Sequence, residues 1–532
     1  MTARHQRSDD GIAIITVMLF MMVVTTLVVG MIGSSMAAQR LSRRDQDRTA
    51  AMAAAQAGVD DYMYRLQLDD GYWRYTSANP PASPANRAFT GWLPIPGSTG
   101  AGAFHYDVNA ARIATEGVVV LTSTGRVRGV ARTVQVELRR RSFLDYMYFT
   151  DYESEDPYSG WTTNPQQVIT NCGGRYWWSG RPGDPTCRRV YFADDDEIEG
   201  PVHSNDTLQI FDDPEFKSSV TTSFPGSTCT PTSKFNFRWQ GYSDTRWDPC
   251  DDHDPDFLPG DPQYAPLLQM PQSNSELRAL GAGTNGCLFK GPTRITLKST
   301  GTMDVRNSTT GGATNCATGS GRPLPRNGVL YVEGSTTCPT GNAAKNPLGY
   351  PIAGDITKYE CTAGDVFLSG DLKGQLTIAT TGRIIIVGDT GYTTGDEHIL
   401  GLVPNRSVEV YHPVDSAGNN LADTTHSDHQ ETIFDDPDIE AAILALSGSF
   451  MVQNPTAGAG FSSELDLIGS IAQRWRGPVG YIDQYGVNHG FEKDYRYDPR
   501  MAYRSPPYFL QPTVAPWRLK TTSETSNPAL PP

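Results

Sequence analysis

The feature that most constrains the fold is an uncharged, apolar run near the start of the chain. No Asp, Glu, Lys or Arg occurs between Gly11 and Gln39. A helix of about 20 apolar residues crosses the hydrocarbon core of a bilayer, whereas the apolar core of a secretory signal is about 7 to 15 residues long. The run therefore predicts a single transmembrane helix over residues 12–38.

The residues after this run favour continuation of the same helix. Residues 39–67 are rich in Ala and Arg and contain no proline, and a break is expected only at the DDGYW sequence of residues 69–73. Small and apolar residues recur every three or four positions, at Ala51, Ala54, Gly58, Tyr62 and Leu66. This spacing predicts one buried stripe. We expect one helix over residues 12–70, with its first half in lipid or a fibre core and its second half under a globular domain.

The flanking charges do not settle the orientation of this helix. Two arginines and two aspartates precede the run, and four arginines follow it, at Arg40, Arg43, Arg44 and Arg48. A positive-inside count alone places the C-terminal side in the cytoplasm. The turn-rich composition and the cysteines favour the outside, and a large domain translocates despite a moderate charge bias. We expect a cell-membrane protein with an extracytoplasmic C-terminal domain.

Two regions and a tail follow the helix. In residues 71–144 the stretch 104–143 alternates polar and apolar residues between Thr-Gly and Arg-Gly turn signals, which predicts a small antiparallel meander. From about residue 145 the composition shifts to Asp, Gly, Thr, Asn and Pro. Residues 145–517 contain many short apolar segments bounded by Gly, Asn or Asp, which predicts a large β-rich domain. Residues 518–532 are predicted to be a disordered tail.

The expected fold class is therefore α+β: a long transmembrane helix and a small antiparallel meander, followed by a large β-rich domain. Segments such as LTIATTGRIIIVGD resemble rungs of a β-solenoid, in which each turn buries its face against the next. No fixed period emerges, so an irregular sheet or a sandwich is an open alternative. Residues 438–450 predict either a short helix or a buried strand.

All eight cysteines lie in the central part of the chain, between residues 172 and 361, and none forms a CxxC pair. They are Cys172, Cys187, Cys229, Cys250, Cys287, Cys316, Cys338 and Cys361. An even number in turn-rich loops favours up to four disulfides in an oxidising compartment, whereas no ligand spacing supports zinc. Neighbour pairing of Cys172 with Cys187 is the simplest of the 105 possible connectivities.

Charge and motifs argue against two classes of function. The net charge of −15 gives no electrostatic reason to bind nucleic acid. No GxSxG, phosphate-binding glycine loop or dinucleotide fingerprint occurs, so we expect no catalytic residues and no cofactor.

Three polar clusters offer ligands that a metal ion could use. Two are rich in the hard oxygen ligands that suit Ca²⁺: Asp194, Asp195, Asp196, Glu197 and His203, and then Asp251, Asp252, His253, Asp254 and Asp256. Neither has EF-hand spacing, so solvated acidic turns are the simpler interpretation. The third, His426, His429 and Glu431, lacks the HExxH spacing of a zinc hydrolase. We therefore assign no metal site and keep Ca²⁺ as an alternative.

Two further features have a structural and a functional interpretation. His203 lies in GPVHSND beside Asn205 and Asp206, where a turn capped by its own Asn or Asp is the simpler explanation. Trp177 and Trp178 are candidates for a surface ligand, but packing under a disulfide loop is expected.

A family resemblance connects these features. A short polar leader ending in Gly11, a long apolar helix and an amphipathic extension together resemble the type IV pilin-like signal. STGRVRGVARTVQVEL resembles the meander of PilX-type proteins. GPVHSNDTLQI, LGLVPNRSVEVYHP and YRYDPRMAYRSPPYF resemble segments of large PilX-type pilus assembly proteins.

The resemblance implies a processing site and a set of partners. Prepilin peptidase would cut the leader, residues 1–11, between Gly11 and Ile12, and the new N-terminus would be methylated. The helix would then pack among the helices of other pilins. Major pilins carry Glu at the fifth mature position, where this chain has Thr16, and a PilX-type minor pilin or a tip-located pseudopilin is compatible with that difference.

Two hypotheses of function follow. The first is a non-enzymatic minor pilin or pseudopilin that is anchored in the membrane before assembly and presents a large surface domain, with a tip position favoured by the size of that domain. The alternative is a membrane-anchored adhesin or enzyme with a Ca²⁺-binding, β-rich ectodomain.

Overall fold

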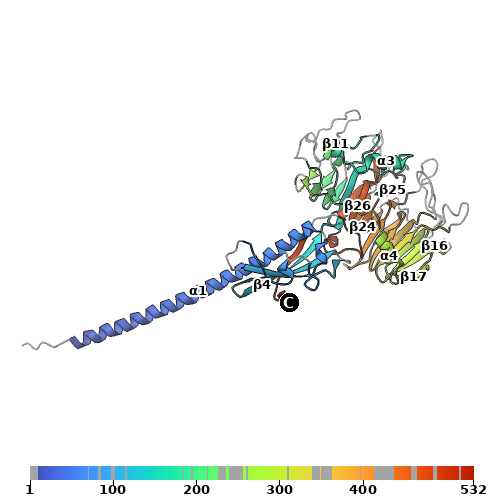
Figure 1. Cartoon of the computed structure of the whole chain (residues 1–532). Coiled ribbons are helices and arrows are strands. Elements are labelled where there is room, and N and C mark those ends of the chain that lie inside the picture. The colour runs from blue at the N-terminus through green and yellow to red at the C-terminus, as the bar shows by residue number, and fades with distance from the viewer. Residues whose placement is uncertain are drawn as a thin grey trace, which may run out of the picture. The chain divides into compact units, whose positions relative to one another are not determined.

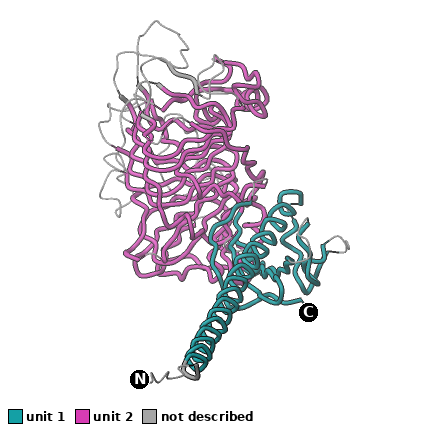
Figure 2. Tube along the Cα trace, turned by 90° about the vertical axis from the view of Figure 1, so that its left-hand side faces the viewer, with its two compact units in different colours: residues 1–111, 118–139, 517–532 teal, residues 112–117, 140–516 magenta. Residues whose placement is uncertain are grey.

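The computed structural model divides the chain into two compact units, shown in Figure 2. Unit 1 comprises Met1–Ala111, Val118–Arg139 and Trp517–Pro532, and unit 2 comprises Arg112–Gly117 and Arg140–Pro516. The structure describes residues 10–531 except 70, 82–85, 97–101, 114–116, 184, 193–195, 212–213, 226–234, 239–255, 259, 261, 308, 310, 338–347, 349–361, 396, 413–436, 457–463, 483–487 and 514–516.

Unit 1 is built on one continuous helix, α1 (Asp10–Leu68), whose N-terminal half extends beyond the sheet of the same unit in Figure 1. Its 59 residues span about 90 Å at 1.5 Å per residue. The second half packs on the sheet through the predicted stripe, and its members Ala51, Ala54, Gly58, Tyr62 and Leu66 are all buried. The long N-terminal helix expected from the apolar run is therefore present.

Small residues let α1 approach the sheet closely. A Cβ added at Gly125 would lie 2.1 Å from the carbonyl oxygen of Ala51 and 2.2 Å from the amide nitrogen of Ala55. On the helix side, a Cβ at Gly58 would lie 2.3 Å from the Ser123 hydroxyl. Because the neighbours of Gly125 are backbone atoms, they cannot rotate away, and only glycine fits there.

The sheet of unit 1 is five-stranded, in the order β1-β2-β3-β4-β30. The strands are β1 (Leu93–Pro94), β2 (Gly102–Asn109), β3 (Val118–Val127), β4 (Val130–Arg140) and β30 (Trp517–Thr525). β2, β3 and β4 pair antiparallel, as the alternation in residues 104–143 predicted, and β1 pairs antiparallel with β2. The β3–β4 turn has φ of +45° at Arg128 and +85° at Gly129, as a two-residue hairpin turn requires. Two 3₁₀ helices precede β1: η1 (Tyr72–Arg74) and η2 (Arg87–Phe89).

The end of the chain differs from the expected disordered tail. Residues 518–525 belong to β30, which lies beside β4 in the sheet. The strand begins at the buried residue Trp517. Lys520 pairs with Glu137 at 3.5 Å, and Glu524 pairs with Arg132. The partner strand lies almost 400 positions earlier in the chain, so no local sequence signal marks this polar, Thr-rich segment as a strand.

Unit 2 contains a mixed 21-stranded sheet, two small two-stranded sheets, and short helices. The strands of the large sheet are β5 (Tyr148–Glu155), β6 (Glu197–Glu199), β7 (Val202–Ser204), β9 (Glu215–Phe216), β10 (Val220–Thr222), β12 (Asp256–Phe257), β13 (Gln263–Tyr264), β14 (Cys287–Lys290), β15 (Thr293–Lys298), β16 (Thr302–Asn307), β17 (Gly319–Pro323), β18 (Val329–Glu333), β19 (Val366–Leu372), β20 (Gln375–Thr380), β21 (Ile384–Tyr392), β22 (Ile399–Pro404), β23 (Val408–Val410), β24 (Asp438–Ala445), β25 (Phe450–Val452), β26 (Glu464–Arg476) and β29 (Glu492–Tyr497). The other elements are β8 (Leu208–Phe211) with β11 (Phe235–Arg238), β27 (Gly480–Ile482) with β28 (Asn488–Gly490), α3 (Pro165–Cys172), α4 (Ser275–Ala282), η3 (Phe143–Asp145), η4 (Trp177–Ser179) and η5 (Pro499–Ala502).

Most pairings in the large sheet are parallel and stack successive stretches of chain. β18, β20, β22, β24 and β26 pair in that order, and β19, β21, β23 and β25 form a second series. The register places apolar side chains in line across neighbouring strands, at Leu330, Ile378, Leu402, Ile443 and Ile471. These side chains are buried in one core. β15–β16 and β16–β17 are antiparallel.

The first and last strands of the large sheet in chain order, β5 and β29, meet on one long strand. β26 pairs through residues 464–469 with β29 and through residues 471–476 with β5. β5 then pairs with β7, and β29 pairs with β6. The polypeptide therefore enters and leaves unit 2 at neighbouring positions.

Candidate functional site

The N-terminal half of α1 is an exposed apolar surface within its unit. Its large side chains are mostly more than half exposed, for example Met18 and Phe20 at 69% each. The hydroxyls of Thr25 and Thr26 donate to the carbonyl oxygens of Met21 and Met22 at 2.6 and 2.9 Å. Their polar groups are thus satisfied inside the helix, as a surrounding of lipid or apolar helices demands.

One helix in the described part of the chain, α1, is long and apolar enough to cross a membrane by length and composition. Gly11 and Ile12 lie in its first turn, where only the backbone is described, and Thr16 lies on its exposed half. Arg40, Arg43 and Arg44 follow the apolar half and are exposed. The residues predicted for processing and anchoring therefore share one uninterrupted helix.

The described carboxylates of the first acidic cluster pair with lysines of the chain. Asp194 and Asp195 lie outside the described residues, whereas Asp196 is buried against Lys493. Glu197 lies 2.6 Å from Lys217, which also contacts Glu199 at 3.0 Å. The carboxylates that the structure describes are thus neutralised by lysines of the chain.

His203 is a buried core residue of β7. Its ring nitrogens bond to the Thr221 hydroxyl at 2.9 Å and to the Asn205 side-chain oxygen at 3.2 Å, and its ring stacks on Tyr146. Burial lowers the pKa of His203 to about 3, so the imidazole is neutral at physiological pH. A neutral, fully bonded histidine without solvent access is structural.

The remaining polar candidates lie partly outside the described residues. Asp251, Asp252, His253 and Asp254 are not described, and of Asp256 only the backbone, in β12, is described. His426, His429 and Glu431 also lie outside the described residues.

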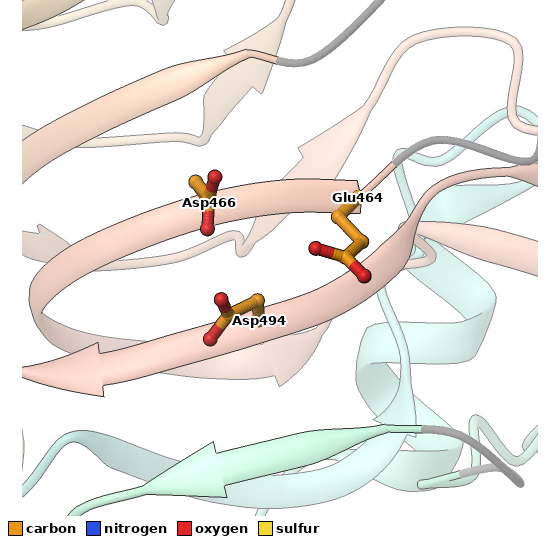
Figure 3. A group of neighbouring side chains, drawn as sticks. All are labelled: Glu464, Asp466 and Asp494. Carbon is orange, nitrogen blue, oxygen red and sulfur yellow. The ribbon is translucent and has the colours of Figure 1, made fainter.

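Sequence analysis missed one acidic group, formed by Glu464 and Asp466 on β26 and Asp494 on β29 (Figure 3). Asp466 and Asp494 are direct partners in the parallel register. Arg496 lies 2.8 Å from Asp466 and 3.4 Å from Asp494, and burial raises the pKa of Asp494 to about 6. The guanidinium pairs with both aspartates and supplies one positive charge to this group of three carboxylates. Only the pairing of two strands brings the residues together, so no sequence motif marks them.

Two disulfides are described, both in unit 2. Cys172 is bonded to Cys187, the simplest pairing expected, and Cys287 is bonded to Cys316. Cys229, Cys250, Cys338 and Cys361 lie outside the described residues.

Trp177 and Trp178 are partly buried, and Trp177 lies near the Cys172–Cys187 disulfide. Trp177 packs against the cluster around this disulfide, donates its indole N–H to the Glu153 carbonyl at 2.6 Å, and lies under Arg181. Trp178 stacks on Tyr176. The pair is therefore used in packing, as the simpler interpretation predicted.

Two family models match parts of the N-terminal half of the chain. The model of the PilX N-terminal family matches residues 10–60, which is nearly all of α1. A domain of unknown function, DUF4900, matches residues 106–229. No curated protein matches the chain. The crystal structure of the competence-associated pilin ComZ from Thermus thermophilus aligns over 90% of this chain and 97% of its own, at 12% identity and a TM-score of 0.24. A TM-score this low carries no argument about fold or function.

The family match confirms the resemblance for the N-terminal segment. Residues 10–60 match the PilX N-terminal family, and the chain continues from them into a β-rich part with disulfides.

Proposed function

We propose that this protein is a non-enzymatic, pilin-like subunit of a type IV pilus or a related filament. The observation that carries the proposal is the PilX-type segment over residues 10–60, whose first half exposes an apolar helical surface of about 30 residues. Before assembly this half anchors the protein in the membrane as a single span. In the filament it packs among the helices of other pilins.

Processing would precede assembly. Prepilin peptidase cleaves between Gly11 and Ile12 and leaves Thr16 at the fifth mature position, with a methylated N-terminus. A carboxylate at that position is costly in lipid, so it favours pairing with the N-terminal amine of a neighbouring subunit. Without one, the subunit is suited to a minor position, and the size of unit 2 favours the tip of the filament.

The large domain would be a β-solenoid on the outer surface. The parallel pairing of β18, β20, β22, β24 and β26 supports this proposal, because each stretch of chain adds one strand and continues the same buried apolar row. The disulfides Cys172–Cys187 and Cys287–Cys316 support an oxidising compartment for unit 2.

The N-terminal sequence of the protein from membranes and from sheared surface material tests the proposal. A start at a methylated Ile12 is the expected result. An intact leader, or a cut near Ala37 by general signal peptidase, would overturn it and leave an anchored adhesin or enzyme as the better hypothesis. Gly11→Val should block the cut, whereas Gly33→Val, the same change within the apolar run, should leave it intact.

A further inference from the structure

Unit 1 is assembled from both ends of the chain. Its helix and four of its strands precede residue 140, but its fifth strand, β30, begins only at Trp517. Residues 141–516 are thus inserted between β4 and β30. The sheet of unit 1 cannot be complete until residues 517–525 have been made.

β30 holds to its neighbours by modest interactions. Trp517 is its only buried residue, and most other side chains of the strand are exposed. Its ion pairs, Lys520–Glu137 and Arg132–Glu524, are partly exposed, and such pairs contribute little on their own. The occupancy of this edge of the sheet therefore depends strongly on how close the rest of the chain keeps β30 to β4.

Folding of unit 2 brings the two ends of the insertion together. The Tyr497 hydroxyl, at the end of β29, donates to the carbonyl oxygen of Leu144 at 2.6 Å. A Cβ at Gly200 would lie 2.6 Å from the Cβ atoms of both Met147 and Tyr497, so the incoming and outgoing segments flank one glycine. The Ser470 hydroxyl on β26 donates to the Phe143 carbonyl at 3.2 Å.

The approach of these ends depends on the join between β5 and β26. Arg474 lies 2.8 Å from Asp151, and Arg476 lies 2.9 Å from Glu153. Gln473 donates to the Tyr148 hydroxyl at 2.6 Å. Without the pairing of β5 with β26, the segment that follows β4 and the segment that precedes β30 are no longer held together.

We propose that β30 is a clasp that completes unit 1 only after unit 2 has folded. With unit 2 unfolded, the 376 residues 141–516 separate β4 from β30. With unit 2 folded, β5 and β29 are held on the same strand, β26, so only residues 141–147 and 498–516 lie between them and the strands of unit 1. Because the probability of closing a loop falls with about the 3/2 power of its length, folding of unit 2 raises the effective concentration of β30 at β4 about 50-fold.

The clasp has a consequence for assembly, which rests on the proposed function. A subunit whose large domain has failed to fold or to be fully exported leaves the β4 edge of unit 1 open. The unpaired β4 edge in unit 1 then distinguishes this subunit from one in which both units have folded. The pairing of β30 with β4 in unit 1, which carries the helix, thus depends on whether unit 2 has folded.

Hydrogen exchange of the full-length protein in detergent micelles, read by mass spectrometry across a urea series, tests the clasp. Amides of β30 and β4 should lose protection at the same urea concentration as those of β5 and β26. Arg476→Met should move both midpoints down together. Arg278→Met, the same change at a partly exposed ion pair of unit 2 whose Glu333 keeps Lys290 at 3.5 Å, should move neither midpoint. A lower midpoint in unit 2 with an unchanged midpoint in β30 and β4 would overturn the proposal.

Two further variants keep the test decisive if Arg476→Met does not fold. Ser449→Ala removes one hydrogen bond to Asp156, 2.7 Å long, and should shift both midpoints by a smaller amount. A chain ending at Pro516 should lose protection in β4 but keep it in β26, whereas unchanged protection in β4 would show that β30 does not complete the sheet. These measurements need no filament, so they can fail or succeed independently of the pilin proposal.

Discussion

Arg476 and Glu153 form an ion pair of 2.9 Å across 323 positions of sequence, and both side chains are almost fully buried. Arg476 lies over the ring of Phe192 at 3.9 Å, and Glu153 accepts a second bond from the Ser204 hydroxyl at 2.9 Å. The pair joins β26 to β5, which belong to the late and early parts of unit 2. The buried charge on each strand is thus paired with a charge on the other strand.

Removal of one partner of this pair is expected to be costly. Arg476→Met leaves the Glu153 carboxylate buried without its cation and should lower the free energy of unfolding by about 3 to 5 kcal/mol. The double change Arg476→Met, Glu153→Gln should cost clearly less, because no uncompensated charge remains. Urea unfolding followed by circular dichroism measures both, and equal losses for the single and double variants would contradict this account.

A side chain at Gly125 is expected to separate α1 from β3. In Gly125→Val the new Cβ meets backbone atoms of Ala51 and Ala55 at 2.1 and 2.2 Å, so the helix must move, at a cost of about 1 to 3 kcal/mol or more. Hydrogen exchange over residues 51–66 should rise. Gly91→Ala is the control, because its Cβ meets only the Arg87 carbonyl oxygen, at 3.8 Å. Equal exchange in the two variants would show that this close approach does not matter.

A buried carboxyl predicts a specific pH dependence. Burial raises the pKa of Asp156 from its ordinary 3.8 to about 6. Its contribution to stability is therefore fully present below about pH 4 and is lost as the pH rises through 6, by on the order of 3 kcal/mol. Asp156→Asn does not ionise, so its stability relative to the native protein should rise between pH 4 and 7. A pH-independent difference in unfolding free energy would refute the assignment.

The Cys172–Cys187 disulfide is expected to stabilise the region beside β5. It closes a segment of 15 residues, which corresponds to about 3 kcal/mol in the chain-entropy description. The double change Cys172→Ala, Cys187→Ala should lower the thermal midpoint, and the reductant sensitivity of the variant should be smaller than that of the native protein. If reductant lowers both midpoints equally, this disulfide contributes nothing and the other cysteines carry the effect.

Calcium is expected to have no effect at the group of Glu464, Asp466 and Asp494. Arg496 already pairs with the two aspartates, and a bound cation would have to displace it. Thermal midpoints in EDTA and in millimolar CaCl₂ should agree. A midpoint that rises with calcium in the native protein, but not in Asp466→Asn, would reveal a site at this position.

Local signals in the sequence predicted the parts of the fold that depend on local physics. The uncharged run and the three-to-four-residue spacing of Ala51 to Leu66 predicted α1 and its buried face. The alternation and the Arg128–Gly129 turn predicted the hairpin of β3 and β4. In both cases the information lies within a few residues of the element that it specifies.

The features that were missed depend on distant partners. β30 is polar and Thr-rich, and it is a strand because β4 offers hydrogen bonds and matching charges. The group around Asp466 and Asp494 exists because β26 and β29 pair in one register. His203 is followed in the sequence by polar residues that could form a functional site with it. The fold instead buries it among Tyr146, Thr221 and Asn205. Register and strand order, rather than composition, determine these contacts.

The hydrogen bond from Tyr497 to Leu144 also has a consequence for the evolution of proteins with this topology. Because the insertion leaves unit 1 and returns to it through adjacent segments, the length of the inserted chain does not affect the geometry of β4 and β30. Strands can be gained or lost at positions remote from β5 and β29 while the helix-bearing unit is unaltered. The topology therefore separates two evolutionary pressures: one part of the gene can diversify in size and surface while the other stays constant.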